Sequence, residues 1–146
     1  MTSPLISLIV PCFNEQRRVK ESIEAIAAFF SAEEEEFELV IVDDGSTDHT
    51  ASIVETLIAS NSSLIKNTRL IRVSHKGKGW AVKSGMLSGY GKYRFLADAD
   101  LSMPIEQLDR FINEMDSGRE VVIGSRQIVG CLLYTSDAAD DTPCLD

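Results

Sequence analysis

Short apolar segments rich in β-branched residues recur along this chain, and a polar, turn-forming stretch follows each of them. The segments are LISLIV (5–10), FELVIV (37–42), RLIRV (69–73), YRFLA (93–97) and EVVIG (120–124). Their length and near-continuous apolarity, without strict alternation, are typical of parallel strands buried on both faces. The chain therefore predicts an α/β fold with a mainly parallel sheet.

Between these segments, apolar residues recur at the spacing of amphipathic helices. The four patterns span residues 19–30, 47–60, 79–88 and 104–115. Pro104 suits the first position of the last helix, and Thr47 is a candidate N-cap for the second, with Asp48 near its positive end. Strands that alternate with helices through right-handed crossovers predict a Rossmann-like structure with helices on both faces of the sheet.

Every predicted strand ends in a polar stretch. These stretches are PCFNE (11–15), DDGSTD (43–48), SHKGKG (74–79), DADLS (98–102) and GSR (124–126). In parallel sheets the carboxyl ends of the strands meet at one edge, where ligands bind. We therefore expect the five stretches to build one site.

Composition limits the class of protein. The 146 residues are 44% hydrophobic and 25% charged, which is ordinary for one globular domain. The formal net charge of -9 argues against nucleic acid as a partner. No apolar stretch reaches the roughly 18 residues that span a bilayer, and the first residues lack a signal peptide pattern, so we expect a cytoplasmic location.

The three cysteines, Cys12, Cys131 and Cys144, have neither the spacing of a zinc site nor an even number for a disulfide framework. We expect Cys12 to be a reduced, buried thiol.

The last segment, CLLYTSDAADDTPCLD (131–146), carries four aspartates and no periodic pattern. Its sequence resembles translated sequencing-adapter read-through, so we interpret the segment as a non-native tail. A native disordered terminus is the alternative. Residues 1–130 are then one partial domain.

Two common phosphate-binding motifs are disfavoured. A dinucleotide-binding domain would carry G-x-G-x-x-G after the first strand, where this chain has PCFNE. The glycines of HKGKGW follow the third strand and do not form the G-x-x-x-x-G-K-[ST] loop.

Asp98 and Asp100 stand one residue apart at the end of a strand, so a backbone turn between them would direct both carboxylates toward one ion. Carboxylates without nearby histidine or cysteine suit Mg²⁺ or Mn²⁺. Lys76 and Lys78 belong to a loop at the same edge and are candidate phosphate ligands, with solvated side chains as the alternative.

Five motifs in order carry a family resemblance: ISLIVPCFNE, VIVDDGSTDHT, HKGKGWAVKSGM, FLADADLS and VVIGSR. Together they resemble the inverting GT-A glycosyltransferases of family 2, nearest to dolichyl- or polyprenyl-phosphate glucosyl- and mannosyltransferases. The resemblance covers about residues 5–130. It implies a GT-A nucleotide-diphospho-sugar transferase fold, truncated here.

The resemblance also implies site residues. The positions that match the family's donor-nucleotide contacts are Pro11, Phe13, Glu15, Val42, Asp44, Asp98, Ala99 and Asp100. Asp98 and Asp100 match the D-x-D pair, which binds the metal and serves catalysis, and Ser102 stands where some relatives carry a further metal ligand. Arg126 matches a phosphate-binding arginine. Asp44 is the expected acceptor for the base, and Phe13 replaces a commoner tyrosine.

The implied reaction is a one-step inversion that moves a hexose from a nucleotide-diphospho-sugar to a polyprenyl or dolichyl phosphate, with UDP-glucose as the favoured donor. A lipid phosphate is already anionic and needs no general base. The full-length protein would then work at the cytoplasmic face of a membrane. The oligomeric state is not indicated.

Three alternatives remain. A saccharide hydroxyl acceptor would need a carboxylate base. A truncated fragment would bind the sugar nucleotide without transfer. The motif FLADADLS also resembles haloacid dehalogenase-type phosphotransferases, but their aspartate follows the first strand, and here the motif follows the fourth.

Overall fold

The computed structural model describes residues 5–32, 37–60 and 67–124. Arg126 and the segment 131–146 lie outside the described residues. The chain divides into two compact units, Met1–Glu106 and Gln107–Asp146. The first unit contains the sheet and four of the five polar stretches.

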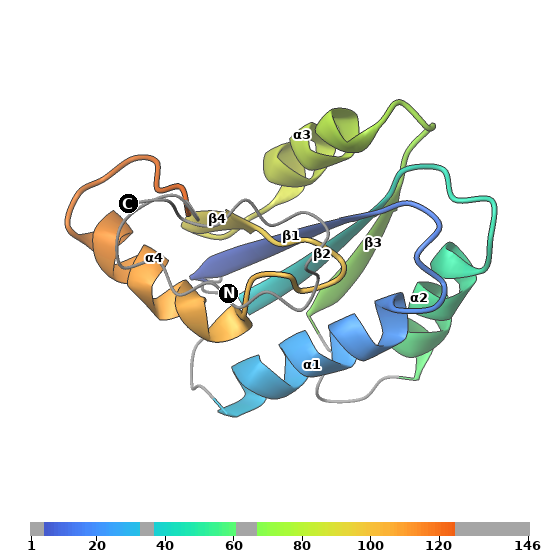
Figure 1. Ribbon diagram of the computed structural model, residues 1–146, viewed down its shortest axis with the longest axis horizontal. Helices are drawn as coiled ribbons and strands as arrows, with labels where there is room; N and C mark the ends of the chain where they lie inside the picture. The colour runs from blue at the N-terminus through green and yellow to red at the C-terminus, as the bar shows by residue number, and fades with distance from the viewer. Residues whose placement is uncertain (1–4, 33–36, 61–66, 125–146) are drawn as a thin grey trace, which may run out of the picture. The chain divides into compact units, whose positions relative to one another are not determined.

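Within the described residues, four parallel strands form the sheet, in the order β3, β2, β1, β4 (Figure 1). Their bounds are Ile6–Cys12 (β1), Phe37–Asp43 (β2), Thr68–Arg72 (β3) and Tyr93–Leu96 (β4). β1 pairs along its whole length with β2, whereas β4 pairs only with Ile6 to Ile9 of β1. The predicted parallel α/β sheet is confirmed.

The two central strands form the middle of the hydrophobic core. Leu8, Ile9, Leu39 and Val40 are all 0% exposed. Residues of β4, in contrast, alternate between half-buried and exposed, as expected at an edge. A central parallel strand is covered on both faces, which is why the sequences of β1 and β2 are apolar almost without interruption.

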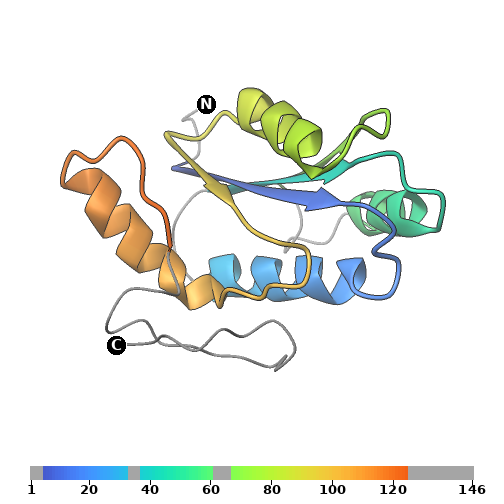
Figure 2. The ribbon, with the colours of Figure 1, turned by 45° about the horizontal axis from the view of Figure 1, so that its top comes forward.

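Three helices cover the sheet of the first unit. Their bounds are Val19–Ala32 (α1), Thr50–Ala59 (α2) and Lys78–Ser88 (α3). α1 and α2 lie on one face and α3 lies on the other, as predicted (Figure 2). A Cβ at Gly85 of α3 would come within 2.4 Å of the Ile9 side chain and 2.9 Å of that of Val42. The glycine that interrupts this helical pattern therefore lets α3 pack closely on the sheet.

The prediction that Thr47 caps α2 is wrong. α2 begins at Thr50, and His49 before it makes no side-chain cap bond. Asp48 Oδ1 accepts the Thr50 N–H at 2.9 Å. The Thr47 N–H donates instead to Asn14 Oδ1 at 2.9 Å, which holds Thr47 in the preceding loop. The predicted place of Asp48 at the positive end of the helix is confirmed.

The predicted fifth strand, residues 120–124, is also wrong. These residues are described and have no regular structure, and none of the described strands pairs with them. Val121 is 75% and Ile123 is 81% exposed. A β-branched sequence forms a strand only where a neighbour takes up its backbone hydrogen bonds.

The helix predicted from Pro104 exists, but it begins later. A single 3₁₀ turn, Ile105–Gln107, comes first, and α4 spans Leu108–Asp116 in the second unit. Leu108, a residue of the predicted apolar stripe, is 2% exposed. In the described parts of the chain, no helix combines the length and apolarity needed to cross a membrane.

The buried carboxylate of Glu38 fastens the amino-terminal edge of the sheet. The Ser7 hydroxyl and the Tyr90 N–H donate to its Oε1, and Arg69 donates to its Oε2 at 2.9 Å. Burial by itself raises the pKa of Glu38, but these donors outweigh it and hold the pKa below its ordinary value. Because the donors come from β1, β3 and the segment before β4, one side chain of β2 connects three strands and the segment that leads into the fourth.

We predict that Glu38→Gln lowers the free energy of unfolding by about 2 kcal/mol at neutral pH, because it removes the charge that these donors stabilise. The pKa of Glu38 is lower in the folded than in the unfolded chain, where it is near 4.5. The stabilisation is therefore complete above that value and is lost as the pH falls through the folded pKa. Urea denaturation between neutral pH and about pH 3 measures both effects.

Glu24→Gln is the matched control, because Glu24 is 54% exposed and lies 4.0 Å from Lys20. Exposed pairs of this kind contribute little. If Glu38→Gln destabilised no more than Glu24→Gln, or if its effect did not shrink at low pH, the role given to Glu38 would be wrong.

Candidate functional site

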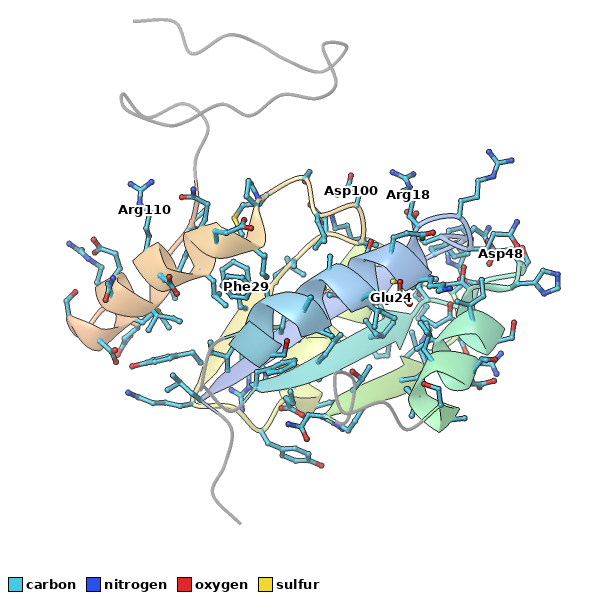
Figure 3. All side chains as sticks on the ribbon, turned by 90° about the horizontal axis from the view of Figure 1, so that it is seen from below. Arg18, Glu24, Phe29, Asp48, Asp100 and Arg110 are labelled. Atoms are coloured by element: carbon cyan, nitrogen blue, oxygen red, sulfur yellow. The ribbon has the colours of Figure 1, made fainter. Side chains whose placement is uncertain are left out.

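Four loops leave the sheet at its carboxyl edge. They comprise residues 13–18 after β1, 44–49 after β2, 73–77 after β3 and 97–104 after β4. Arg18, Asp48 and Asp100, labelled in Figure 3, come from three of these loops and lie toward the end of the unit where α1 begins. Four of the five polar stretches that the sequence placed at one edge are therefore at one edge, and the fifth, residues 124–126, falls in the second unit and lies mostly outside the described residues.

Pro11 releases β4 from the sheet just before the paired aspartates. β1 and β4 remain bonded as far as the Ala97 N–H, which donates to the Ile9 carbonyl at 3.0 Å. The next bond of a parallel ladder would run from the N–H of residue 11 to the Ala97 carbonyl, and proline has no N–H. The chain therefore leaves the sheet here and turns through Asp98 and Asp100.

A tight turn presents the two carboxylates. The Leu101 N–H donates to the Asp98 carbonyl at 3.0 Å, and Leu101 has a φ of 51°, a left-handed conformation unusual for leucine. Ala99 is 6% exposed, and its carbonyl accepts the Ser22 hydroxyl of α1 at 2.5 Å. Because the residue between them is buried and held, Asp98 and Asp100 are both left exposed at the surface.

Asp44 anchors the loop after β3. Its carboxylate accepts the N–H groups of Lys76 at 3.0 Å and Gly77 at 2.9 Å, and Oδ2 lies 2.9 Å from His75 Nδ1. Burial alone would raise the pKa of Asp44. The two amide donors and His75 outweigh this effect, so the pKa of Asp44 is below its ordinary value. An ionised, buried aspartate thus holds the middle of a loop whose first residue, Val73, donates its N–H to the Asp43 carbonyl at 2.9 Å.

His75 joins this loop to the one after β1. Its ring stacks on Phe13 with a centroid distance of 4.2 Å and an interplanar angle of 18°. Gly45 makes the approach possible: it has a φ of 68°, and a Cβ there would lie 2.9 Å from the His75 backbone nitrogen. His75 is therefore fixed by Asp44 and Gly45, which follow β2, and its ring contacts Phe13, which follows β1.

The loops after β1 and β2 are tied together by backbone-to-side-chain hydrogen bonds. The Asn14 N–H donates to the Ser46 hydroxyl at 2.9 Å, and the Glu15 N–H donates to Thr50 Oγ1 at 2.8 Å. In return, Asn14 Oδ1 accepts from Thr47, and Asn14 itself has a φ of 55°. This reciprocal pairing fixes the segment that carries Phe13.

Lys78, the first residue of α3, reaches the paired aspartates. Its Nζ lies 2.5 Å from Asp98 Oδ1. Lys76 behaves differently, because its Nζ lies 4.6 Å from the centroid of the Trp80 ring. Residues 75–78 thus contact Phe13, Asp44 and Asp98, which belong to three different loops.

The carboxylates of Asp98 and Asp100 are ligands of the type that a hard divalent cation prefers. Asp98 already has the Lys78 ammonium against one oxygen, so this position attracts positive charge. Asp100 uses Oδ1 to accept the Ser102 N–H at 3.0 Å. Among the described residues, no group of three or more histidine, cysteine, aspartate or glutamate side chains could hold a metal alone. Two carboxylates completed by phosphate oxygens and water match the usual coordination of Mg²⁺.

Several predicted site residues have structural roles of their own. Val42 is 0% exposed in the cluster with Ile9, Val40 and Ala81, so its side chain packs in the core, and its predicted contact with a nucleotide stays a prediction. Asp44 uses three of the roughly four acceptor positions of a carboxylate, which leaves one for a base.

The remaining predictions are placed but untested. Pro11 and Glu15 are half-buried, and Glu15 lies 3.2 Å from the Arg18 side chain. Ser102 is exposed beside Asp100, and its metal-ligand role stays a prediction. Arg126 lies outside the described residues.

The sequence analysis missed two residues, Ser22 and His75. Ser22 lies among the apolar residues of α1, but its hydroxyl reaches the Arg18 carbonyl one turn back as well as the Ala99 carbonyl, so its position alone did not indicate the contact outside the helix. His75 was visible only as a loop histidine, and nothing in its spacing indicated a stack on Phe13.

Cys12 and Asp43 are the buried last residues of β1 and β2 at this edge. Burial, together with the carboxylates of Glu15 and Asp43, raises the pKa of Cys12 to about 12, which excludes a thiolate nucleophile at neutral pH. Cys12 is free and buried, as expected. Asp43 shapes the turn after β2, because its Oδ1 accepts the Ser46 N–H at 3.3 Å.

Comparison with known proteins decides the family. The model of Glycosyl transferase family 2 matches residues 7–138. The chain belongs to this family. The match ends inside the segment 131–146, and the predicted boundary at residue 130 stays a prediction. This family 2 chain is 35% identical to the dolichyl-phosphate beta-glucosyltransferase of Dictyostelium discoideum. The alignment covers 83% of this chain and 39% of that relative, so the chain spans less than half of the relative's length.

Solved structures of glycosyltransferases share the fold. The mannosyltransferase PcManGT from Pyrobaculum calidifontis, in complex with GDP-Man and Mn²⁺, has a TM-score of 0.56 and 26% identity over 68% of this chain and 28% of its own. TarS 1-349 of S. aureus, in complex with UDP-GlcNAc, has a TM-score of 0.58 and 23% identity over 84% of this chain and 37% of its own. The expected GT-A fold class is confirmed.

We predict that Ser22→Ala lowers the free energy of unfolding by about 1 kcal/mol, because the buried Ala99 carbonyl loses its donor. Ser31→Ala is the control, since Ser31 donates to the Ala28 carbonyl one turn back on the exposed side of α1. Thermal and urea unfolding of both variants measure the difference. Equal small effects would remove Ser22 from the support of the turn at Asp98.

We predict that Gly45→Ala destabilises the chain by about 1–2 kcal/mol, because the methyl group meets the His75 backbone and alanine disfavours a positive φ. Gly79→Ala is the control: its Cβ would meet nothing within 4 Å. Since Gly79 lies in α3, that variant should be neutral or slightly stabilised. A neutral Gly45→Ala in the same denaturation series would contradict the contact.

Proposed function

We propose that this chain is the donor-binding part of an inverting hexosyltransferase that uses a nucleotide-diphospho-sugar. The observation that carries the proposal is the bridge made by residues 75–78. His75 stacks on Phe13, the amides of Lys76 and Gly77 bond Asp44, and Lys78 pairs with Asp98. Residues proposed for the base and residues proposed for the diphosphate are therefore parts of one connected edge.

The nucleoside end of the donor would bind between the loops after β1 and β2. Phe13 offers an exposed ring for stacking, with 42% of its surface accessible. Asp44 has one acceptor position left, and we propose that it accepts an N–H of the base. Pro11 and Glu15 would line the ribose side of the same segment.

The diphosphate end would bind at the turn after β4. Asp98 and Asp100 would hold Mg²⁺ or Mn²⁺, with Ser102 as a weaker candidate ligand, and the mannosyltransferase structure that contains Mn²⁺ supports this choice. When bound, the metal would neutralise charge on the diphosphate. Lys78, and Lys76 after leaving Trp80, would donate to the phosphates, and so would Arg126.

The acceptor is proposed from the curated relative, whose name gives dolichyl phosphate as its acceptor and glucose as its sugar. A polyprenyl or dolichyl phosphate attacks as an anion, so the edge needs no base. In the four described loops, Glu15 pairs with Arg18, Asp48 bonds the start of α2, and Asp44, Asp98 and Asp100 are assigned to the donor, so we propose none of them as a base. We propose UDP-glucose as the donor, and the cytoplasmic face of a membrane as the place of reaction.

A second function is binding without transfer. The chain covers 39% of its curated relative, and our proposal assigns its described residues to the donor and none of them to the acceptor. A chain that binds UDP with a metal but transfers no glucose to a polyprenyl phosphate would have this function. Assay of both activities on the same preparation separates the two.

We predict that Asp100→Ala abolishes Mn²⁺-dependent UDP binding and leaves the fold intact, because the exposed carboxylate is removed without a change in the core. Isothermal titration with UDP, with and without Mn²⁺, measures the effect. Glu24→Ala, an exposed carboxylate on α1, should titrate like the unchanged chain. Mn²⁺-dependent binding that survives in Asp100→Ala would remove this residue from the metal site.

A further inference from the structure

We propose that the outer face of α3, formed by Trp80, Lys83 and Leu87, docks this protein on the surface of an anionic lipid bilayer. The inference rests on the proposed function, in which the acceptor is a lipid phosphate, and it adds the surface that would face the membrane. The partner is the bilayer itself, whose headgroups carry negative charge and whose interior takes up apolar side chains.

The segment that contains α3 is basic, although the chain as a whole is acidic. Residues 56–97 contain eight of the 14 lysines and arginines and none of the 23 aspartates and glutamates. The eight are Lys66, Arg69, Arg72, Lys76, Lys78, Lys83, Lys92 and Arg94. Arg69, Arg72 and Lys78 pair with acids from outside the segment, so its charge is only partly balanced. A region of positive charge attracts a surface of negative charge.

α3 has apolar side chains on both of its faces. Its buried residues, Ala81 and Gly85, pack on β1 and β2. Trp80 is 39% exposed and Leu87 is 76% exposed. Because Trp80, Lys83 and Leu87 follow the spacing i, i+3, i+7, they share the face away from the sheet. A helix that packs one face on a sheet normally has a polar outer face, so the exposed apolar residues of α3 need another explanation.

No described helix of the first unit covers this outer face, because α1 and α2 lie on the other side of the sheet (Figure 2). Tyr90, two residues after the end of α3, adds a further ring that is 69% exposed. Lys83 and Lys92 are exposed in the same region of the chain. Apolar rings and lysines are therefore presented to solvent together.

This combination of side chains suits a bilayer better than a protein partner. Tryptophan and tyrosine are enriched at the boundary between headgroups and lipid tails. Lysine can lay its methylene groups along apolar surface while its ammonium group stays with the headgroups. Protein interfaces, in contrast, are depleted in lysine.

The amino end of α3 adjoins the candidate site. Lys78 is the first residue of the helix, and its Nζ lies 2.5 Å from Asp98 Oδ1. Docking of the outer face would therefore hold the turn that carries Asp98 close to the headgroups. In the proposed function, the phosphate of the acceptor lipid lies at the same level, so it would reach this edge without leaving the membrane.

The test uses the fluorescence of Trp80, which is the only tryptophan of the chain and lies on the proposed face. The unchanged chain should bind vesicles of phosphatidylcholine mixed equally with phosphatidylglycerol, with a blue shift of its emission. Vesicles of phosphatidylcholine alone should bind it much more weakly. Binding to the mixed vesicles should weaken as the salt concentration rises.

Two variants separate the charge from the apolar contact. Lys83→Glu should weaken binding to the mixed vesicles at least about tenfold, because it replaces a positive charge near an anionic surface with a negative one. Leu87→Gln should weaken it about three- to tenfold. Lys20→Glu is the matched control, because Lys20 is an exposed lysine of α1 on the other side of the sheet, and its vesicle binding should stay within about twofold. All three variants should keep Mn²⁺-dependent UDP binding.

The outcomes separate this inference from the proposed function. UDP binding with Mn²⁺ but no binding to the mixed vesicles would overturn the inference and leave the proposed function intact. Equal losses in Lys83→Glu and Lys20→Glu would also overturn it. So would a blue shift that appears without vesicles as the protein concentration rises, because the face would then bind a second copy of the chain. Vesicle binding without UDP binding would support the docking face and overturn the proposed function.

Discussion

The buried carboxylate of Asp44 is the interaction on which the candidate site depends. In the loop after β3, the pairing with β2 ends at the Val73 N–H, which donates to the Asp43 carbonyl, and the backbone amides of Lys76 and Gly77 are satisfied by the Asp44 side chain. A charged acceptor that receives several donors in a buried place is among the stronger polar interactions in a protein. Its position at the end of a central strand transfers the rigidity of the sheet to residues 75–78, and through them to Phe13 and Asp98.

A second constraint acts where the chain must leave the sheet. Pro11 lacks the N–H that would extend the pairing of β1 with β4, so the backbone departs at Ala97 and the two aspartates follow in a tight turn. Two like charges one residue apart repel each other, and the Lys78 ammonium at Asp98 offsets this repulsion. A cation is thus part of this edge even in the protein alone, which is consistent with an edge that receives a metal-bound diphosphate in the proposed function.

Much of the architecture followed from residue patterns. Continuous apolar runs predicted the central strands β1 and β2, and 3.6-residue periodicity predicted α1, α2 and α3, because burial on two faces or on one stripe leaves a direct trace in the sequence. Residues 120–124 carried the same trace without becoming a strand, since pairing needs a neighbour that composition cannot supply. Thr47 failed as a cap for a related reason: its N–H and its hydroxyl both donate to Asn14 Oδ1, far away in sequence, and α2 begins only at Thr50.

By itself, the sequence determined the parallel α/β class, the carboxyl edge as the place of the polar loops, and the family 2 motifs, including Asp98 and Asp100. These depend on local pattern and on the geometry of parallel strands. Only the tertiary structure decided that Val42 is part of the core, that Ser22 holds Ala99 and that His75 stacks on Phe13. Each of these contacts joins segments from different elements, and its distance and direction are set by how helices and loops pack around the sheet, which no spacing along the chain encodes.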